Sequence, residues 1–118
     1  KRFQDVKEYL LEKILGIVNV EWVMFRIIDI DTHQTIKDGS KARGSVVSLK
    51  CEISNKELLE GKYLEDYEVI RSNNKNLSID TFCIIPKTKL GDNQLFMIKF
   101  IIKQLEQLFL LFTFIHKN

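Results

Sequence analysis

EWVMFRIIDI, residues 21–30, is the stretch that decides the fold. It is rich in β-branched and aromatic side chains, and apolar residues occupy both of its alternating sets of positions. This pattern is typical of a strand buried on both faces, so we expect it in the centre of a sheet. Residues 31–34 then read as a turn, and a short strand at 35–37 is expected to end at Asp38-Gly39.

The segment that follows this turn region predicts a strand leading straight into a helix. Residues 45–53, SVVSLKCEI, largely alternate apolar and polar side chains, which is typical of a strand with one face toward the core and one toward solvent. Ser54 comes next and lies three residues before Glu57, the spacing of a helix capping box. The sequence therefore predicts a short helix at 55–60, ended by Gly61.

A hairpin is expected in the second half of the chain. Residues 63–71 and 77–85 have strand character and flank SNNKN at 72–76. Asn tolerates positive φ, so this segment is suited to a turn between antiparallel strands. Pro86 is expected to end the second strand, because proline cannot donate to a sheet.

Helices are predicted at both ends of the chain. Residues 3–15 repeat apolar side chains at helical spacing, with Gly16 as the expected end, and residues 93–114 do the same with Asp92 as the expected cap. Strands joined by hairpins, with helices before and after them, predict an α+β fold. We expect a single antiparallel sheet with the N- and C-terminal helices on one face.

The last helix also carries the spacing of a coiled-coil seam. Apolar residues recur three and four positions apart over about two and a half heptads, and past Leu108 the helix is apolar nearly all round. Such a surface must be covered, so we expect a homodimer through the terminal helices. The predicted dimer residues are Leu95, Ile98, Ile102, Leu105, Phe109 and Phe112.

Composition limits the classes of partner. The chain has 118 residues, the size of one domain, and its net charge of +2 is too small to indicate direct nucleic-acid binding. The longest apolar run, residues 108–115, is interrupted by Thr113 and is far shorter than the ~20 residues of a membrane span. The chain starts at Lys1 without an initiator Met or a secretory signal, so we expect an excised piece of a longer cytoplasmic protein.

The sequence predicts neither an enzyme nor a metal or cofactor site. His33 and His116 are the two histidines, and neither has a Cys or a second His at ligand spacing. Asp29 and Asp31 share one face at a strand end; a solvated turn is the preferred interpretation, and a divalent cation is the alternative.

Neither the cysteines nor the glycine-rich segment indicates catalysis. Cys51 and Cys83 lie in apolar runs, where burial weakens a thiol as a nucleophile. GSKARG at 39–44 lacks the order of a phosphate-binding loop and is interpreted as a mobile basic loop. Anion binding by Lys41 and Arg43 is the alternative for that segment.

A small-molecule pocket against the sheet is a further hypothesis, because the face away from the terminal helices also carries large apolar groups. The predicted lining residues are Phe25, Ile27, Leu49, Cys51, Tyr67 and Cys83.

The overall pattern resembles a GAF domain, the small sensor module related to PAS domains. The resemblance rests on a leading helix, WVMFRIIDIDTHQTI, a late strand LSIDTFCIIP ending at Pro86, and the closing helix LFMIKFIIKQLEQLFLLF. It covers nearly the whole chain, although the chain is short for the family. It also lacks the chromophore-attaching Cys-His pair of the bilin-binding members and a cyclic-nucleotide signature. PAS and roadblock-like modules share much of this order.

The resemblance implies a sensor that sits upstream of a transcriptional activator, histidine kinase or diguanylate cyclase. Such a domain binds a small ligand or only dimerises, and its end helices build the dimer interface. We therefore expect a signal-sensing and dimerisation domain that regulates an attached output domain. The alternative is a structural protein–protein interaction module without a ligand.

Overall fold

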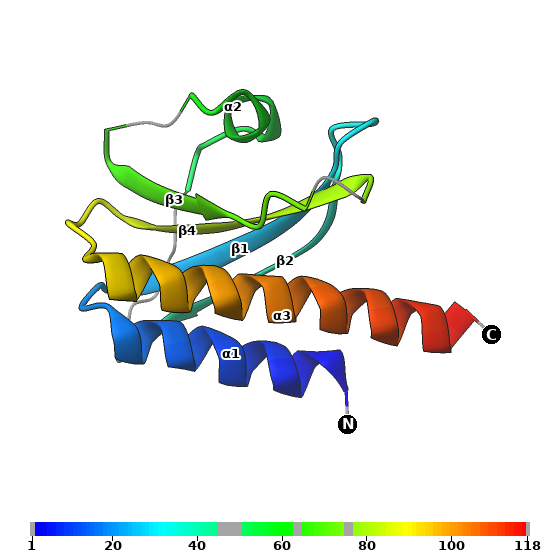
Figure 1. Ribbon diagram of the computed structural model, residues 1–118, viewed down its shortest axis with the longest axis horizontal. Coiled ribbons are helices and arrows are strands. Elements are labelled where there is room, and N and C mark those ends of the chain that lie inside the picture. Colours follow the sequence, from blue (N-terminus) through cyan, green and yellow to red (C-terminus); the bar gives the residue numbers. More distant parts are fainter. Residues whose placement is uncertain (1, 45–50, 63–64, 75–76, 118) are drawn as a thin grey trace.

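The computed structural model describes residues 2–44, 51–62, 65–74 and 77–117, and Figure 1 shows their arrangement. Helices stand at both ends of this part of the chain, and strands lie between them. The elements in chain order are α1 (Phe3–Ile17), β1 (Trp22–Asp29), β2 (Thr35–Ala42), α2 (Asn55–Glu60), β3 (Tyr67–Arg71), β4 (Ile79–Pro86) and α3 (Asp92–Lys117).

Within the described residues, the fold is α+β with one open, four-stranded antiparallel sheet in the order β2-β1-β4-β3. Two hairpins, β1–β2 and β3–β4, are joined by antiparallel pairing of β1 with β4, in which Phe25 faces Cys83. The prediction of an antiparallel sheet between terminal helices is confirmed. So is the central place of the strand that begins at Trp22.

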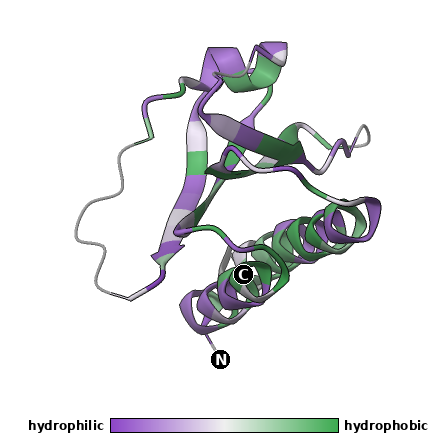
Figure 2. Cartoon of the chain, turned by 90° about the vertical axis from the view of Figure 1, so that its left-hand side faces the viewer, coloured by the Kyte–Doolittle hydropathy of each residue, from purple (hydrophilic) through white to green (hydrophobic). Residues whose placement is uncertain are grey.

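The helices cover the two faces of the sheet unequally. α1 and α3 lie side by side on one face, and α2 lies on the other (Figures 1 and 2). The larger apolar core fills the space between the sheet and the two long helices, and it includes Leu11, Phe25 and Ile102, all fully buried. A smaller cluster under α2 is built around Leu58 and Phe82.

The start of α2 matches the predicted capping box. The Ser54 hydroxyl accepts the Glu57 amide N–H at 3.1 Å, and Glu57 Oε1 accepts the Ser54 amide N–H at 3.0 Å. Gly61 ends the helix at φ 74°. Local chemistry fixes this helix, since each group lies within one turn of its partner.

β2 is longer than the sequence pattern predicts. It continues through Asp38-Gly39 to Ala42, so the segment interpreted as a mobile loop is mostly strand. Gly39 lies opposite Phe25, and a Cβ on Gly39 would come within 2.7 Å of Phe25 Cε1. The glycine therefore accommodates a neighbouring ring within a strand instead of ending one.

The predicted strand at 45–53 is wrong where it can be compared. Residues 51–53 have no regular secondary structure, and residues 45–50 lie outside the described part of the chain. The Arg26 guanidinium in β1 donates to the Ile53 carbonyl at 2.6 Å and to Asn55 Oδ1 at 3.1 Å. These side-chain contacts hold the entry to α2 against the sheet.

The predicted ends of the other elements need small corrections. β3 starts at Tyr67, with residues 65–66 in a turn before it. α1 runs through Gly16 to Ile17. Asp92 is the first residue of α3, and the Gly91 amide before it donates to the Gln94 side chain at 2.9 Å. The predicted turn character at 72–76 agrees with Asn73, which has φ 55°.

Candidate functional site

The predicted dimer residues of α3, here called the inner seam, mostly face the chain's own core. Ile98, Ile102 and Leu105 are fully buried against the sheet and α1. Phe109 and Phe112 are half-buried, and their rings contact the Phe3 ring edge-on at centroid distances of 5.7 and 6.1 Å. Leu95 is 43% exposed. The inner seam is therefore, for the most part, the face by which α3 packs within one chain.

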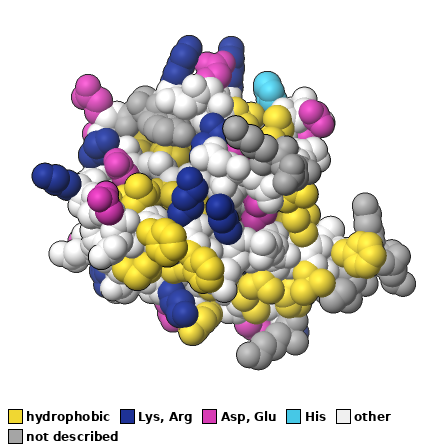
Figure 3. All heavy atoms as spheres, in the orientation of Figure 1, with side chains coloured by type: hydrophobic (Ala, Val, Ile, Leu, Met, Phe, Trp, Pro, Cys, Tyr) yellow, Lys and Arg dark blue, Asp and Glu magenta, His cyan; other side chains and the backbone are white. Residues whose placement is uncertain are grey.

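A second apolar face lies on the opposite side of the same helix. Its members, here called the outer stripe, are Phe96, Phe100, Leu111 and Phe114, exposed by 73%, 58%, 53% and 68%. At 3.6 residues per turn these positions fall within an arc of roughly 60° that points away from Ile102. Figure 3 shows hydrophobic side chains recurring along the length of α3. Apolar groups on both opposed faces of a helix make the outer face a candidate contact surface.

The outer stripe borders a shallow groove between α1 and α3. The groove has a volume of about 330 Å³. Its lining residues are Lys13, Ile17, Phe96, Met97, Phe100, Ile101 and Gln104. Tyr9, 57% exposed, extends the apolar surface along α1, and the Lys13 ammonium lies 5.1 Å from the centre of its ring. Exposed apolar area thus continues from α3 onto α1.

Lys41 and Arg43, the candidates for anion binding, contact groups of the chain itself. Lys41 Nζ lies 3.3 Å from Glu12 Oε1 and 3.5 Å from Glu8 Oε1. The hydrogen bond to Glu12, followed by the charge of Glu8, raises the pKa of Lys41. These pairs engage the Lys41 charge and link β2 to α1.

The Arg43 guanidinium caps the end of α1. It donates to the carbonyl oxygens of Leu15, Val18 and Val20, the last two at 2.9 and 2.8 Å. Positive charge at a helix C-terminus is favourable, and backbone carbonyls there lack partners within the helix. Arg43 is therefore a structural residue that joins the end of β2 to α1.

The residues predicted to line a ligand pocket lie on opposite faces of the sheet. Phe25, Ile27 and Cys83 belong to the core beneath the terminal helices, whereas Cys51 and Tyr67 belong to the cluster under α2. The sixth, Leu49, lies outside the described residues. The sheet separates the two groups, so these five side chains do not line one common cavity.

Each cysteine has a defined environment. Complete burial raises the pKa of the Cys83 thiol to about 12, which leaves almost no thiolate at neutral pH. Cys51 is half-buried, and its sulfur lies 3.9 Å from an Arg26 nitrogen.

The acidic turn after β1 is stabilised by hydrogen bonds from its backbone amides to the Asp29 side chain. Asp29 Oδ1 accepts the amide N–H groups of Asp31 and Thr32 at 2.9 and 3.0 Å. The Thr32 amide is the main reason why the pKa of Asp29 lies below its usual value. His33 follows at φ 63°, in the turn as predicted. In the described part of the chain, no three His, Cys, Asp or Glu side chains come together as metal ligands.

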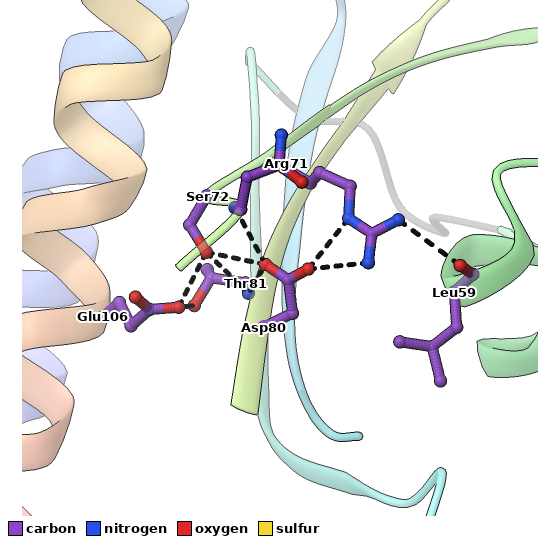
Figure 4. A network of polar contacts seen from close by, with 7 residues as sticks. Leu59, Arg71, Ser72, Asp80, Thr81 and Glu106 are labelled. Atoms are coloured by element: carbon purple, nitrogen blue, oxygen red, sulfur yellow. Dashed lines mark hydrogen bonds and ion pairs between the residues drawn. The ribbon is translucent and has the colours of Figure 1, made fainter. Parts of the chain in front are cut away.

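A buried polar network, which sequence reasoning missed, connects α3 to the β3–β4 hairpin (Figure 4). Asp80, 3% exposed, accepts from the Arg71 guanidinium through Nε at 2.8 Å and Nη2 at 2.7 Å. Asp80 Oδ1 also accepts the Ser72 hydroxyl at 2.7 Å and the Asn73 amide N–H at 3.1 Å. The carboxylate is thus fully engaged in the core.

Glu106 extends this network from α3. Its carboxyl group is 1% exposed, and Oε2 lies 2.8 Å from the Ser72 hydroxyl and 2.7 Å from the Thr81 hydroxyl. Asn74 contacts Oε1 at 3.4 Å. A movement of α3 along its axis would break these contacts, so the network fixes the position of α3 on the sheet. In sequence, Glu106 looks like any solvated helix residue, because its partners lie more than 20 positions away.

Within the described residues, no helix combines the length and the hydrophobicity that a bilayer span requires. Comparison of the chain with protein-family models, with curated proteins and with solved structures finds no match.

Proposed function

We propose that this chain is a regulatory dimerisation domain of the GAF/PAS-like kind, which acts on an attached output domain through its terminal helices. The outer stripe of α3 carries the proposal: four large apolar side chains, more than half exposed, lie directly opposite the core-facing side of one helix. A helix with this arrangement is expected to pack against a second surface. The occupant we assign to it is a second copy of the same chain.

The arrangement of the helices supports a role in transmitting a signal. α1 and α3 pack against each other on one face of the sheet. Gln94 Nε2 near the start of α3 donates to the Ile17 carbonyl at the end of α1 over 3.0 Å, and Glu106 connects α3 to the hairpin. A change in the sheet would therefore reach both terminal helices, and pairing of two copies would convert it into a change between subunits.

Sedimentation velocity tests the dimer. We expect the 118-residue chain to dimerise reversibly at high micromolar concentration. Phe96→Lys with Phe100→Lys should raise the dissociation constant about tenfold or more, because aromatic anchors dominate interfaces. Ile36→Lys is the matched control: Ile36 is also exposed and apolar, but it lies in β2 and its replacement should leave dimerisation unchanged. A chain that stays monomeric at these concentrations would contradict the proposal.

A structural interaction module without a ligand is the second candidate. It is favoured by one observation, namely that the predicted pocket residues divide between the two faces of the sheet. Thermal melting of the chain with a panel of nucleotides and metabolites separates the candidates, because a ligand that binds the folded state raises Tm. A shift with any compound supports sensing, and a dimer that shows no shift supports the structural module.

A further inference from the structure

We infer that the outer stripes of two copies pair in antiparallel orientation, across a two-fold axis that passes at the level of Leu105. The inference rests on the proposed dimerisation and adds the geometry and register of the interface. It follows from the spacing of the stripe, from the charges that lie within it, and from the area that it exposes.

The outer stripe is nearly symmetric about its own midpoint. Phe96 and Phe114 lie nine residues before and after Leu105. Phe100 lies five residues before it and Leu111 six residues after it. In an antiparallel pair centred there, Phe96 of one copy meets Phe114 of the other, and Phe100 meets Leu111. A two-fold interface needs such a self-complementary patch, because every contact between two different residues occurs twice, once on each side of the axis.

The polar residues between the apolar ends also favour the antiparallel arrangement. Lys103 and Gln107, both exposed, lie two residues before and after Leu105 on the outer side of α3. Antiparallel pairing places Lys103 opposite Gln107 of the second copy. Parallel pairing would place the two Lys103 residues at the same level of the paired helices, and like charges brought close together are destabilising.

The exposed area fits a reversible dimer. At about 200 Å² for each ring, the three phenylalanines of the stripe expose roughly 400 Å² per copy. Two copies would bury about 800 Å² through these rings alone, half of the roughly 1,600 Å² of a standard interface. Leu111, Met97 and the aliphatic part of Lys103 add to this area. We therefore expect an interface at the weak end of the specific range.

Distances between spin labels on identical positions test the orientation. In an antiparallel pair, the two Asn93 positions are offset by about 36 Å along the helices, from a rise of 1.5 Å per residue. In a parallel pair they face each other, at about the 10 Å that separates packed helices. Asn93 is exposed and lies beyond the N-terminal end of the outer stripe, three residues before Phe96. Gln104 is the control position, because it lies close to the axis and should give a short distance in either orientation.

The measurement uses Asn93→Cys and Gln104→Cys, each in a Cys51→Ser background, since Cys83 is fully buried. Sedimentation first establishes whether each labelled chain is dimeric. A long Asn93 distance with a short Gln104 distance supports antiparallel pairing. A short Asn93 distance, or a long Gln104 distance, in a dimeric sample overturns the antiparallel pairing of the outer stripes. It does not contradict dimerisation itself. A monomeric unlabelled chain overturns both proposals.

Discussion

The Thr81 hydroxyl in β4 lies 2.7 Å from Glu106 Oε2 in α3, and neither side chain is more than 1% exposed. This contact joins the last strand to the last helix inside the core. Packing of apolar surfaces tolerates small sliding movements, but a buried hydrogen bond has a narrow range of lengths and angles. The pair therefore determines the register of α3 on the sheet, and with it the position of the outer stripe.

Glu106→Gln is predicted to be close to neutral, whereas Glu106→Ala is predicted to destabilise the fold. The Ser72 hydroxyl lies near both Asp80 and Glu106 but has one hydrogen, so it cannot donate to both. A glutamine amide supplies hydrogens to both hydroxyls. Alanine leaves buried hydroxyls without their partner, at a cost of about 1–3 kcal/mol. Urea unfolding measures both variants, and equal losses would contradict this account.

Arg71→Ala is predicted to lower stability by about 3 kcal/mol, because it leaves the Asp80 carboxylate buried without its cation. The guanidinium also lies 4.7 Å from the centre of the Phe82 ring, and that contact is lost with it. Lys87→Ala is the control. Its ammonium pairs with Glu68 at 3.0 Å on the surface, and such pairs contribute roughly 0–1 kcal/mol. Denaturant titration measures the free energy of unfolding of both variants. Similar losses of stability would contradict the burial of the Arg71–Asp80 pair.

Gly39→Ala is predicted to destabilise by about 1–3 kcal/mol, because the new methyl group meets the Phe25 ring and the Lys7 side chain. Phe25→Leu should recover part of the loss in the double variant. Gly16→Ala is the matched control, since Gly16 lies inside α1 and no described residue approaches its added methyl group within 4 Å. That variant should be stabilised by about 0.5–1 kcal/mol. Thermal melts compare the variants.

Features decided by neighbouring residues were predictable from sequence. The capping box of Ser54 and Glu57 forms within one helical turn, and the turn at Asn73 depends on the tolerance of one residue for positive φ. The central strand was predictable as well, because apolar residues on both faces leave few other places for it. None of these needs knowledge of a distant partner.

Features decided by distant residues were not predictable. Gly39 looks like a turn residue until Phe25 on the adjacent strand is known to lie beside it. Pocket residues were assigned to one site although they face opposite ways, since pairing between strands decides which positions share a face. The inner seam looked intermolecular because three-four spacing serves equally for packing on a sheet and for a coiled coil.

The α2 capping box predicts a change of stability with pH. The Ser54 amide holds the pKa of Glu57 below its ordinary value of 4.5. A group whose pKa is lowered by folding stabilises the fold above its unfolded pKa and loses that contribution as the pH falls through the folded pKa. The Tm of Glu57→Gln should therefore fall less than that of the wild type as the pH is lowered below 4.5. Parallel Tm curves would indicate that Glu57 does not contribute.

An aspartate is predicted to unfold the chain when it is placed on the inner face of α3, and to weaken only dimerisation when it is placed on the outer face. Ile102→Asp places a charge among fully buried side chains, and the cost of several kcal/mol is comparable to the whole stability of a small domain. That variant should lose its cooperative thermal transition in circular dichroism. Phe100→Asp on the outer stripe should keep the transition within a few degrees of wild type and reduce dimerisation in sedimentation. If Ile102→Asp instead remains folded and only becomes monomeric, the inner seam is the intermolecular surface and the outer stripe is not.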